Sequence, residues 1–182
     1  MVAVLAGALL VGTVWHEVVG HGFVAVVCGG RIDQVEILGL ELYPRLHCLG
    51  WQHHYGSCGT AGVDSAAACA LVSLGGSMST WLVSFIAMVL LWVRRWGPCM
   101  RIVLVCLAIW WIDLLTYTLP SWGLPRSAVW GQDYYSEPYE AAVALGVPGW
   151  LFQVFAVASS VLLCSGLLIH LIRLRKSTDY RT

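Results

Sequence analysis

The chain has 182 residues, of which 59% are hydrophobic and only 11% are charged, and its formal net charge at pH 7 is zero. Soluble domains carry about 25% charged residues, so this composition excludes an ordinary soluble domain. A zero net charge provides no positive field to attract nucleic acid, so a nucleic-acid partner is not expected either. With a mean hydropathy of +0.76, the chain is expected to be an integral membrane protein whose first partner is the lipid bilayer.

Four stretches are long and apolar enough to cross a bilayer, which takes roughly 20 residues in a helix. They cover residues 2–27, 66–93, 102–119 and 150–172. The first stretch lacks basic residues at its start and carries His-Glu in its middle, so we interpret it as a retained helix rather than a signal peptide. We therefore predict an all-α polytopic membrane protein, with a single membrane domain over residues 1–182 and long outer loops at 28–65 and 120–149.

Each long loop contains a pattern that predicts a short regular element. Residues 31–42 alternate loosely between apolar and polar side chains, which indicates a short strand or β-hairpin over the membrane face. In the proline-rich second loop, residues 137–145 are expected to form a short helix. Cys48 and Cys58 of the first loop are predicted to form a disulfide. The alternative is that they form a second metal site with the neighbouring residues His53 and His54.

The basic residues predict the orientation in the membrane. They gather in two clusters, one after the second span and one after the fourth: Arg94, Arg95 and Arg101, then Arg173, Arg175 and Lys176. Clusters of this kind favour the cytoplasmic side of a membrane. Both termini are therefore expected in the cytoplasm, and both long loops outside or in a lumen.

Ionisable side chains within the spans are the first indication of function. His16, Glu17 and His21 lie in the first span and Asp113 lies in the third. Such groups are costly in lipid, so they usually face a cavity or a partner. With a rise of roughly 1.5 Å per residue, His16 and Asp113 lie at similar depth. A shared polar site, in a cavity between the first and third spans, is therefore expected.

The segment His16-Glu17-Val18-Val19-Gly20-His21 is close to the pattern H-E-x-x-H, in which two histidines bind zinc and the glutamate is a general base. Here the second histidine is one residue further along, and on a regular helix this rotates it by about 140° from the first. A π-bulge or a local break would return both imidazoles to one face, and Gly20 would permit it. The alternative to metal binding is a structural cluster of buried polar groups.

Residues 16–39, HEVVGHGFVAVVCGGRIDQVEILG, resemble the motif helix of site-2 protease-like intramembrane zinc metallopeptidases. The small-residue stretch 74–79 and the segments 117–120, 131–133 and 144–148 resemble later motifs of that family. The resemblance implies that His16 and His21 are zinc ligands and that Glu17 is the catalytic base. The variant His-Glu-x-x-x-His spacing also binds zinc in a soluble dipeptidyl peptidase family.

The resemblance leaves the third zinc ligand open. Asp133 matches by its place before the Leu-Gly-Val-Pro stretch, Asp113 is the alternative by its depth, and Glu137 is a further candidate. Tyr117 stands where the family has an Asn that holds substrate. Histidine and carboxylate ligands also suit divalent ions other than zinc.

The expected function is therefore a zinc-dependent intramembrane or juxtamembrane peptidase, with Glu17 activating a water molecule and a membrane protein or peptide as substrate. Two alternatives stay open. One is a catalytically silent metal-binding subunit or chaperone that works with other membrane subunits. The other is a membrane metal carrier.

Overall fold

The computed structural model of the chain describes residues 2–50, 56–125 and 135–179. Four helices in this part are long and apolar enough to cross a membrane, over residues 3–27, 66–93, 98–122 and 149–174. They are joined by a small antiparallel sheet and a short helix. The predicted helical membrane fold is confirmed, and the predicted spans differ from the observed ones by a few residues at their ends.

The first span changes its helical winding in the middle. It begins as α1 (Val2–Trp15), continues as the π-helix η1 (His16–Phe23) and ends as α2 (Val24–Val27). The backbone stays in the right-handed helical region through both junctions, with φ −61° and ψ −46° at Trp15 and φ −64° and ψ −40° at Phe23. The span is therefore one continuous helix with a widened central turn.

The first loop forms a four-stranded sheet with the strand order β3-β2-β1-β4 and antiparallel pairs. Its strands are β1 (Arg31–Ile37), β2 (Leu40–Tyr43), β3 (His47–Cys48) and β4 (Gly56–Ala61). Leu38 and Gly39 join β1 to β2 with positive φ angles of 53° and 76°, as in the two-residue turns that suit the twist of a hairpin. The predicted hairpin is confirmed, and β3 and β4 extend it.

The sheet overturns the predicted disulfide. Cys48 lies on β3 and Cys58 on β4, at opposite edges of the sheet, and both thiols are free. Neighbouring strands are about 4.8 Å apart, so three strand spacings exceed the roughly 7 Å between Cα atoms that a disulfide can bridge. The alternative was a second metal site, and its histidines, His53 and His54, lie outside the described residues.

The second span, α3 (Ala66–Val93), begins at a capping serine, where the Ala68 amide donates to Ser65 Oγ at 3.1 Å. The third span is broken into α4 (Pro98–Ala108), α5 (Trp111–Thr118) and η2 (Leu119–Trp122). The break lies at Ile109 and Trp110, where the Trp110 amide donates to Leu107 O three residues back at 3.1 Å. The chain continues as α6 (Glu137–Ala144), close to the predicted short helix, and α7 (Gly149–Asp179).

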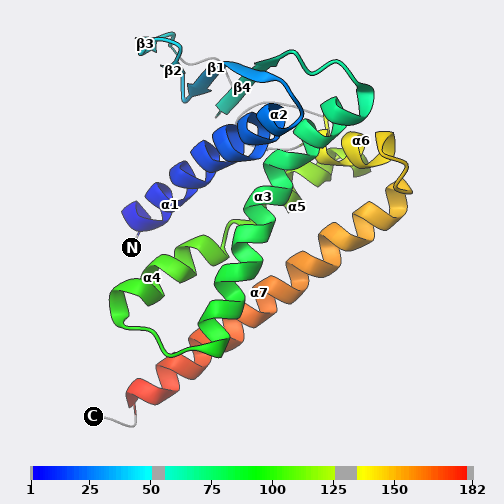
Figure 1. Cartoon of the computed structure of the whole chain (residues 1–182). Coiled ribbons are helices and arrows are strands. Elements are labelled where there is room, and N and C mark those ends of the chain that lie inside the picture. The colour runs from blue at the N-terminus through cyan, green and yellow to red at the C-terminus, as the bar shows by residue number, and fades with distance from the viewer. Residues whose placement is uncertain (1, 51–55, 126–134, 180–182) are drawn as a thin grey trace.

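Helix α3 lies at the centre of the arrangement (Figure 1). One apolar cluster joins it to α4 and α7, through residues such as Leu91, Leu104 and Leu163. A second cluster joins α5, α6 and α7 through Leu114, Ala142, Phe152 and Ala156. In Figure 1 the sheet and α6 lie at one end of the helices, and the α3–α4 link and the end of α7 lie at the other. The cytoplasmic orientation of the termini stays a prediction.

Candidate metal centre

The π-helical turn brings the two motif histidines together. His16 and His21 are five residues apart, and the i→i+5 bonding of a π-helix places such residues nearly above one another. Their Nε2 atoms are 3.0 Å apart, and the side chains are almost fully buried, with 2% and 7% of each residue exposed. Of the two possibilities that the sequence left open, a π-bulge and a local break, the structure has the π-helical turn.

Glycines allow η1 and α3 to touch at this point. A Cβ on Gly20 would lie 2.4 Å from the Cα of Gly76, and one on Gly75 would lie 2.4 Å from the Gly20 carbonyl oxygen. A Cβ on Gly76 would lie 2.5 Å from the Nε2 atoms of both histidines. Gly20 is thus needed for close helix packing, whereas the sequence singled it out as the residue that would permit a π-bulge or a local break. The same contact explains the small-residue stretch 74–79.

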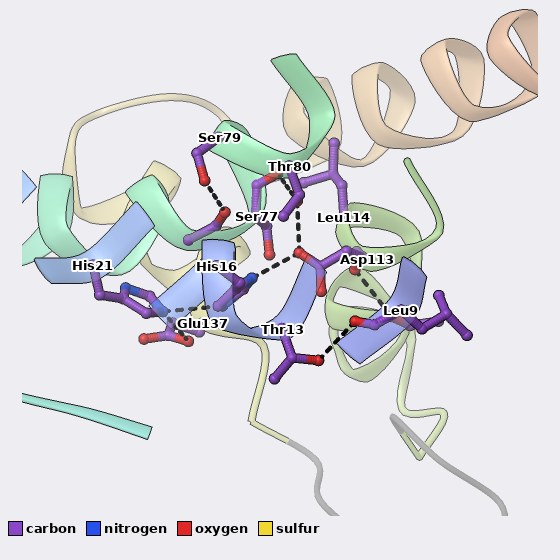
Figure 2. A network of polar contacts seen from close by, with 12 residues as sticks. Leu9, Thr13, His16, His21, Ser77, Ser79, Thr80, Asp113, Leu114 and Glu137 are labelled. Atoms are coloured by element: carbon purple, nitrogen blue, oxygen red, sulfur yellow. Dashed lines mark hydrogen bonds and ion pairs between the residues drawn. The ribbon is translucent and has the colours of Figure 1, made fainter. Parts of the chain in front are cut away.

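Each histidine is oriented by an acceptor on its outer nitrogen, and Figure 2 shows the contact of His16 with Asp113. Nδ1 of His16 lies 2.8 Å from Asp113 Oδ2, and Nδ1 of His21 lies 2.7 Å from the Val72 carbonyl oxygen. A carboxylate and a carbonyl only accept, so both Nδ1 atoms carry the proton. Thr80 Oγ1 also donates to Asp113 Oδ2, at 2.8 Å. Carboxylate and carbonyl partners of this kind usually orient metal-binding histidines.

The consequence is an electrostatic conflict that a cation relieves. With Nδ1 protonated, each Nε2 holds a lone pair, and the two lone pairs face one another across 3.0 Å. Two buried acceptors at this distance repel unless a proton or a metal ion lies between them. The arrangement of His16 and His21 is therefore that of two ligands aimed at one positive centre.

A carboxylate completes the group. Glu137, the first residue of α6, places Oε2 3.7 Å from His21 Nε2. Among the described residues, ligand atoms of His16, His21 and Glu137 lie within 4.8 Å of one another, a set that could hold a metal ion. The start of α6 is held by Ser136, whose hydroxyl donates to the Tyr117 carbonyl oxygen at 2.7 Å.

The carboxylates predicted as third ligands have different outcomes. Asp113 binds the outer nitrogen of His16, so it orients that ligand from outside the group of three. Asp133 lies outside the described residues, and its role as ligand stays a prediction. Glu137 was the last candidate from the sequence, and among the described residues it is the carboxylate that lies beside the two histidines. Its place at the start of a predicted short helix was the available signal.

Glu17 lies beside His16 and the sheet. It is buried, with 4% exposed, and it interacts electrostatically with His16. A Cβ on Gly56 of β4 would lie 2.8 Å from Glu17 Oε1, so the carboxylate contacts the sheet edge where that strand begins. Burial, and then the Glu17 charge, raise the pKa of the Cys58 thiol on the same strand to about 11. The described geometry thus places a buried acid next to the candidate ligands, outside the group of three.

Tyr117 covers one face of His16. Its ring is tilted by 30° from that of His16, with centroids 4.9 Å apart, and the residue is 9% exposed. The sequence singled out Tyr117 only through the resemblance, as the residue that stands in place of an Asn.

A cavity of about 390 Å³ lies between α1 and the α4–α5 segment, the two spans between which the sequence predicted a water-filled cavity. Its lining is mostly apolar, with Leu9, Leu10 and Ile112 on the walls and Leu38 from the β1–β2 turn. Asp113 and Thr80 are part of the lining. The cavity therefore reaches the groups that orient His16.

In comparisons with protein-family models, with curated proteins and with solved structures, nothing matches this chain. The assignment of the site therefore depends on its own geometry.

Proposed function

We propose that the protein is a membrane-embedded metallopeptidase that holds one zinc ion on His16, His21 and Glu137. The observation that carries the proposal is the pair of inward-facing Nε2 atoms, 3.0 Å apart, with the Glu137 carboxylate beside them. Two histidines and a glutamate are a ligand set of zinc peptidases, which leave a fourth position open. When bound, such an ion polarises a water molecule and the carbonyl of the scissile bond.

The chain's own residues supply positioning and proton transfer. Asp113 and the Val72 carbonyl fix the two imidazoles through their outer nitrogens. Glu17 is the buried acid beside the ligands, and in this proposal it takes the proton of the attacking water and passes it to the leaving amine. General acid–base catalysis of this kind contributes about 10²–10⁴-fold to a rate.

The substrate in this proposal is a peptide segment at or within the membrane. His16 and His21 lie in a span that is long and apolar enough to cross a bilayer, and Glu137 lies on the short helix α6. The cavity that reaches Asp113 has mostly apolar walls, which suit an apolar segment better than a charged one.

A second function, a catalytically silent subunit that retains the metal, is favoured by one observation. The Tyr117 ring packs on His16 at the position where the resemblance places a substrate-holding Asn. A metal carrier is favoured less, because both histidines are buried and held by outer partners, and such a site suits a resident ion better than an exchanging one.

Two measurements test the metal site. Elemental analysis of the detergent-purified chain should find about one zinc per chain, as expected for a three-ligand site. His21→Ala and Glu137→Gln should lose the metal. Glu140→Gln, at an exposed position of the same helix, is the matched control and should keep it. A metal-free wild type would overturn the proposal.

Catalysis is tested separately, with the wild type in phosphatidylcholine vesicles and a mixture of synthetic single-span peptides. Mass spectrometry should detect cleavage that falls about 10²–10⁴-fold in Glu17→Gln while zinc is retained. Glu41→Gln, on β2 of the sheet, should cleave at the wild-type rate. Zinc without cleavage of any peptide would favour the silent subunit, and equal cleavage by Glu17→Gln would exclude Glu17 as the base.

A further inference from the structure

A second cavity, of about 830 Å³, lies at the end of the molecule away from the metal centre. It is formed where the α3–α4 link meets the last turns of α7, at the lower end of the helices in Figure 1. Four arginines line it, together with two tryptophans and one histidine: Arg94, Arg95, Arg101, Arg173, Trp92, Trp96 and His170. We call this group the arginine cavity.

The charge of the arginine cavity is not balanced locally. None of the described residues that line it is acidic. The sequence has no Asp or Glu from residue 65 to 112, nor from residue 141 to 178, and these two segments contain all of the lining. Four guanidinium groups, which stay charged at any physiological pH, therefore face one hollow without a carboxylate from the segments that build it.

Several of these side chains are already held in place. The Arg94 guanidinium lies 4.7 Å from the centre of the Trp96 ring, and that of Arg173 lies 4.7 Å from the centre of Trp92. Arg101 donates through Nη2 to the Trp96 carbonyl oxygen at 2.9 Å. Cation–π contacts and hydrogen bonds of this kind limit side-chain motion, so less entropy is lost when a ligand binds.

One polar atom at the cavity is also buried without a partner in the part of the chain that the structure describes. Nε2 of His170 is buried and has no hydrogen-bond partner among the described residues, and His170 is part of the lining. A buried polar group without a partner is costly. An oxygen-rich ligand in the cavity would provide that partner.

We propose that the arginine cavity binds a phosphate group, such as the one in the headgroup of an anionic lipid. Arginine forks bind phosphate oxygens in pairs, and basic pockets between membrane helices bind acidic headgroups. The position fits, because the cavity lies at the ends of apolar helices, and the tryptophans Trp92 and Trp96 are typical of the membrane–water interface. The positive charges alone would be enough to set the orientation of the chain in the membrane. That role does not require the arginines to line one cavity, as they do here.

The test is a titration of the full-length chain in neutral detergent, read by native mass spectrometry, with phosphatidylglycerol and with zwitterionic phosphatidylcholine. The wild type should bind phosphatidylglycerol in preference. Each arginine near an anionic headgroup contributes about fivefold to binding, so Arg94→Gln/Arg173→Gln should weaken phosphatidylglycerol binding by about 25-fold. The matched control, Arg31→Gln/Arg45→Gln, removes the same charge from exposed positions at the sheet and should change it little.

A third double variant, Arg94→Lys/Arg173→Lys, keeps the charge and should recover most of the affinity. It separates loss of the site from loss of the fold, together with the unfolding temperature of each variant. Inorganic phosphate is titrated in parallel. If phosphate displaces the lipid from the wild type but does not bind to Arg94→Gln/Arg173→Gln, a free phosphate is a second source of the ligand. The proposal would be overturned if Arg94→Gln/Arg173→Gln and Arg31→Gln/Arg45→Gln weakened phosphatidylglycerol binding equally, or if the wild type showed no preference for phosphatidylglycerol. Zinc content plays no part in these readouts, so failure here is distinct from failure of the proposed function.

Discussion

Substituting Gly76 by alanine tests the metal centre at its closest contact. The added Cβ would lie 2.5 Å from Nε2 of both His16 and His21. Ordinary contact begins at 3.4 Å, so each nitrogen would have to move by about 0.9 Å. Neither imidazole moves freely, because Asp113 and the Val72 carbonyl hold the outer nitrogens.

Metal–ligand distances tolerate errors of only about 0.2 Å. A shift of about 0.9 Å therefore exceeds what two ligands on one ion can accommodate. Loss of an outer partner costs about 10–100-fold in metal affinity, and we expect Gly76→Ala to exceed about 100-fold. The assay is a zinc titration of purified protein against a chelating indicator, alongside the thermal unfolding of the metal-free chain.

The matched control is Gly7→Ala, on α1, where an added Cβ meets nothing within 4 Å. This variant should bind zinc as the wild type does. Wild-type affinity and stoichiometry in a folded Gly76→Ala chain would refute the reasoning, because the Nε2 atoms would then not face a common ion beside α3.

Three further predictions follow from the same contacts. Asp113→Asn should lower zinc affinity by about 10–100-fold, since an amide orients the histidine less strongly than a carboxylate. The control Asp33→Asn on β1 should bind zinc as the wild type does. Equal zinc affinities of Asp113→Asn and the wild type would show that Asp113 does not orient His16 for metal binding. Because the pKa of Cys58 is raised to about 11, its thiol should be alkylated slowly at pH 9 and faster towards pH 11. Glu17→Gln removes the neighbouring negative charge that raises this pKa, so alkylation at pH 9 should be faster in that variant. Peptide mass spectrometry measures the alkylation rate, and an unchanged rate in Glu17→Gln would show that Glu17 does not lie next to β4. Gly20→Ala should lower the unfolding temperature, because its Cβ would lie 2.4 Å from the backbone of α3; an unchanged temperature would mean that the two helices can separate without cost.

The sequence predicted the parts of this protein that depend on local pattern. Apolar runs of sufficient length predicted four spans, and the second was predicted with the bounds that the structure has, Ala66–Val93. The spacing of His16 and His21 predicted a π-bulge or a local break, because a regular helix would turn the two side chains away from one another, and the structure has the π-helical turn. Matched depth predicted that Asp113 and His16 meet, and they lie within hydrogen-bond distance.

Partners that are distant in the sequence were decided only by the tertiary structure. The β4 strand and the strand order placed Cys48 and Cys58 at opposite edges of the sheet, which no local pattern could indicate. The role of Asp113 as an outer partner, and the place of Glu137 beside His21, depend on how α5 and α6 pack against α3. Spacing along a chain limits which side chains share a helical face, but distances between elements are set by packing, and the glycine contact between η1 and α3 sets them here.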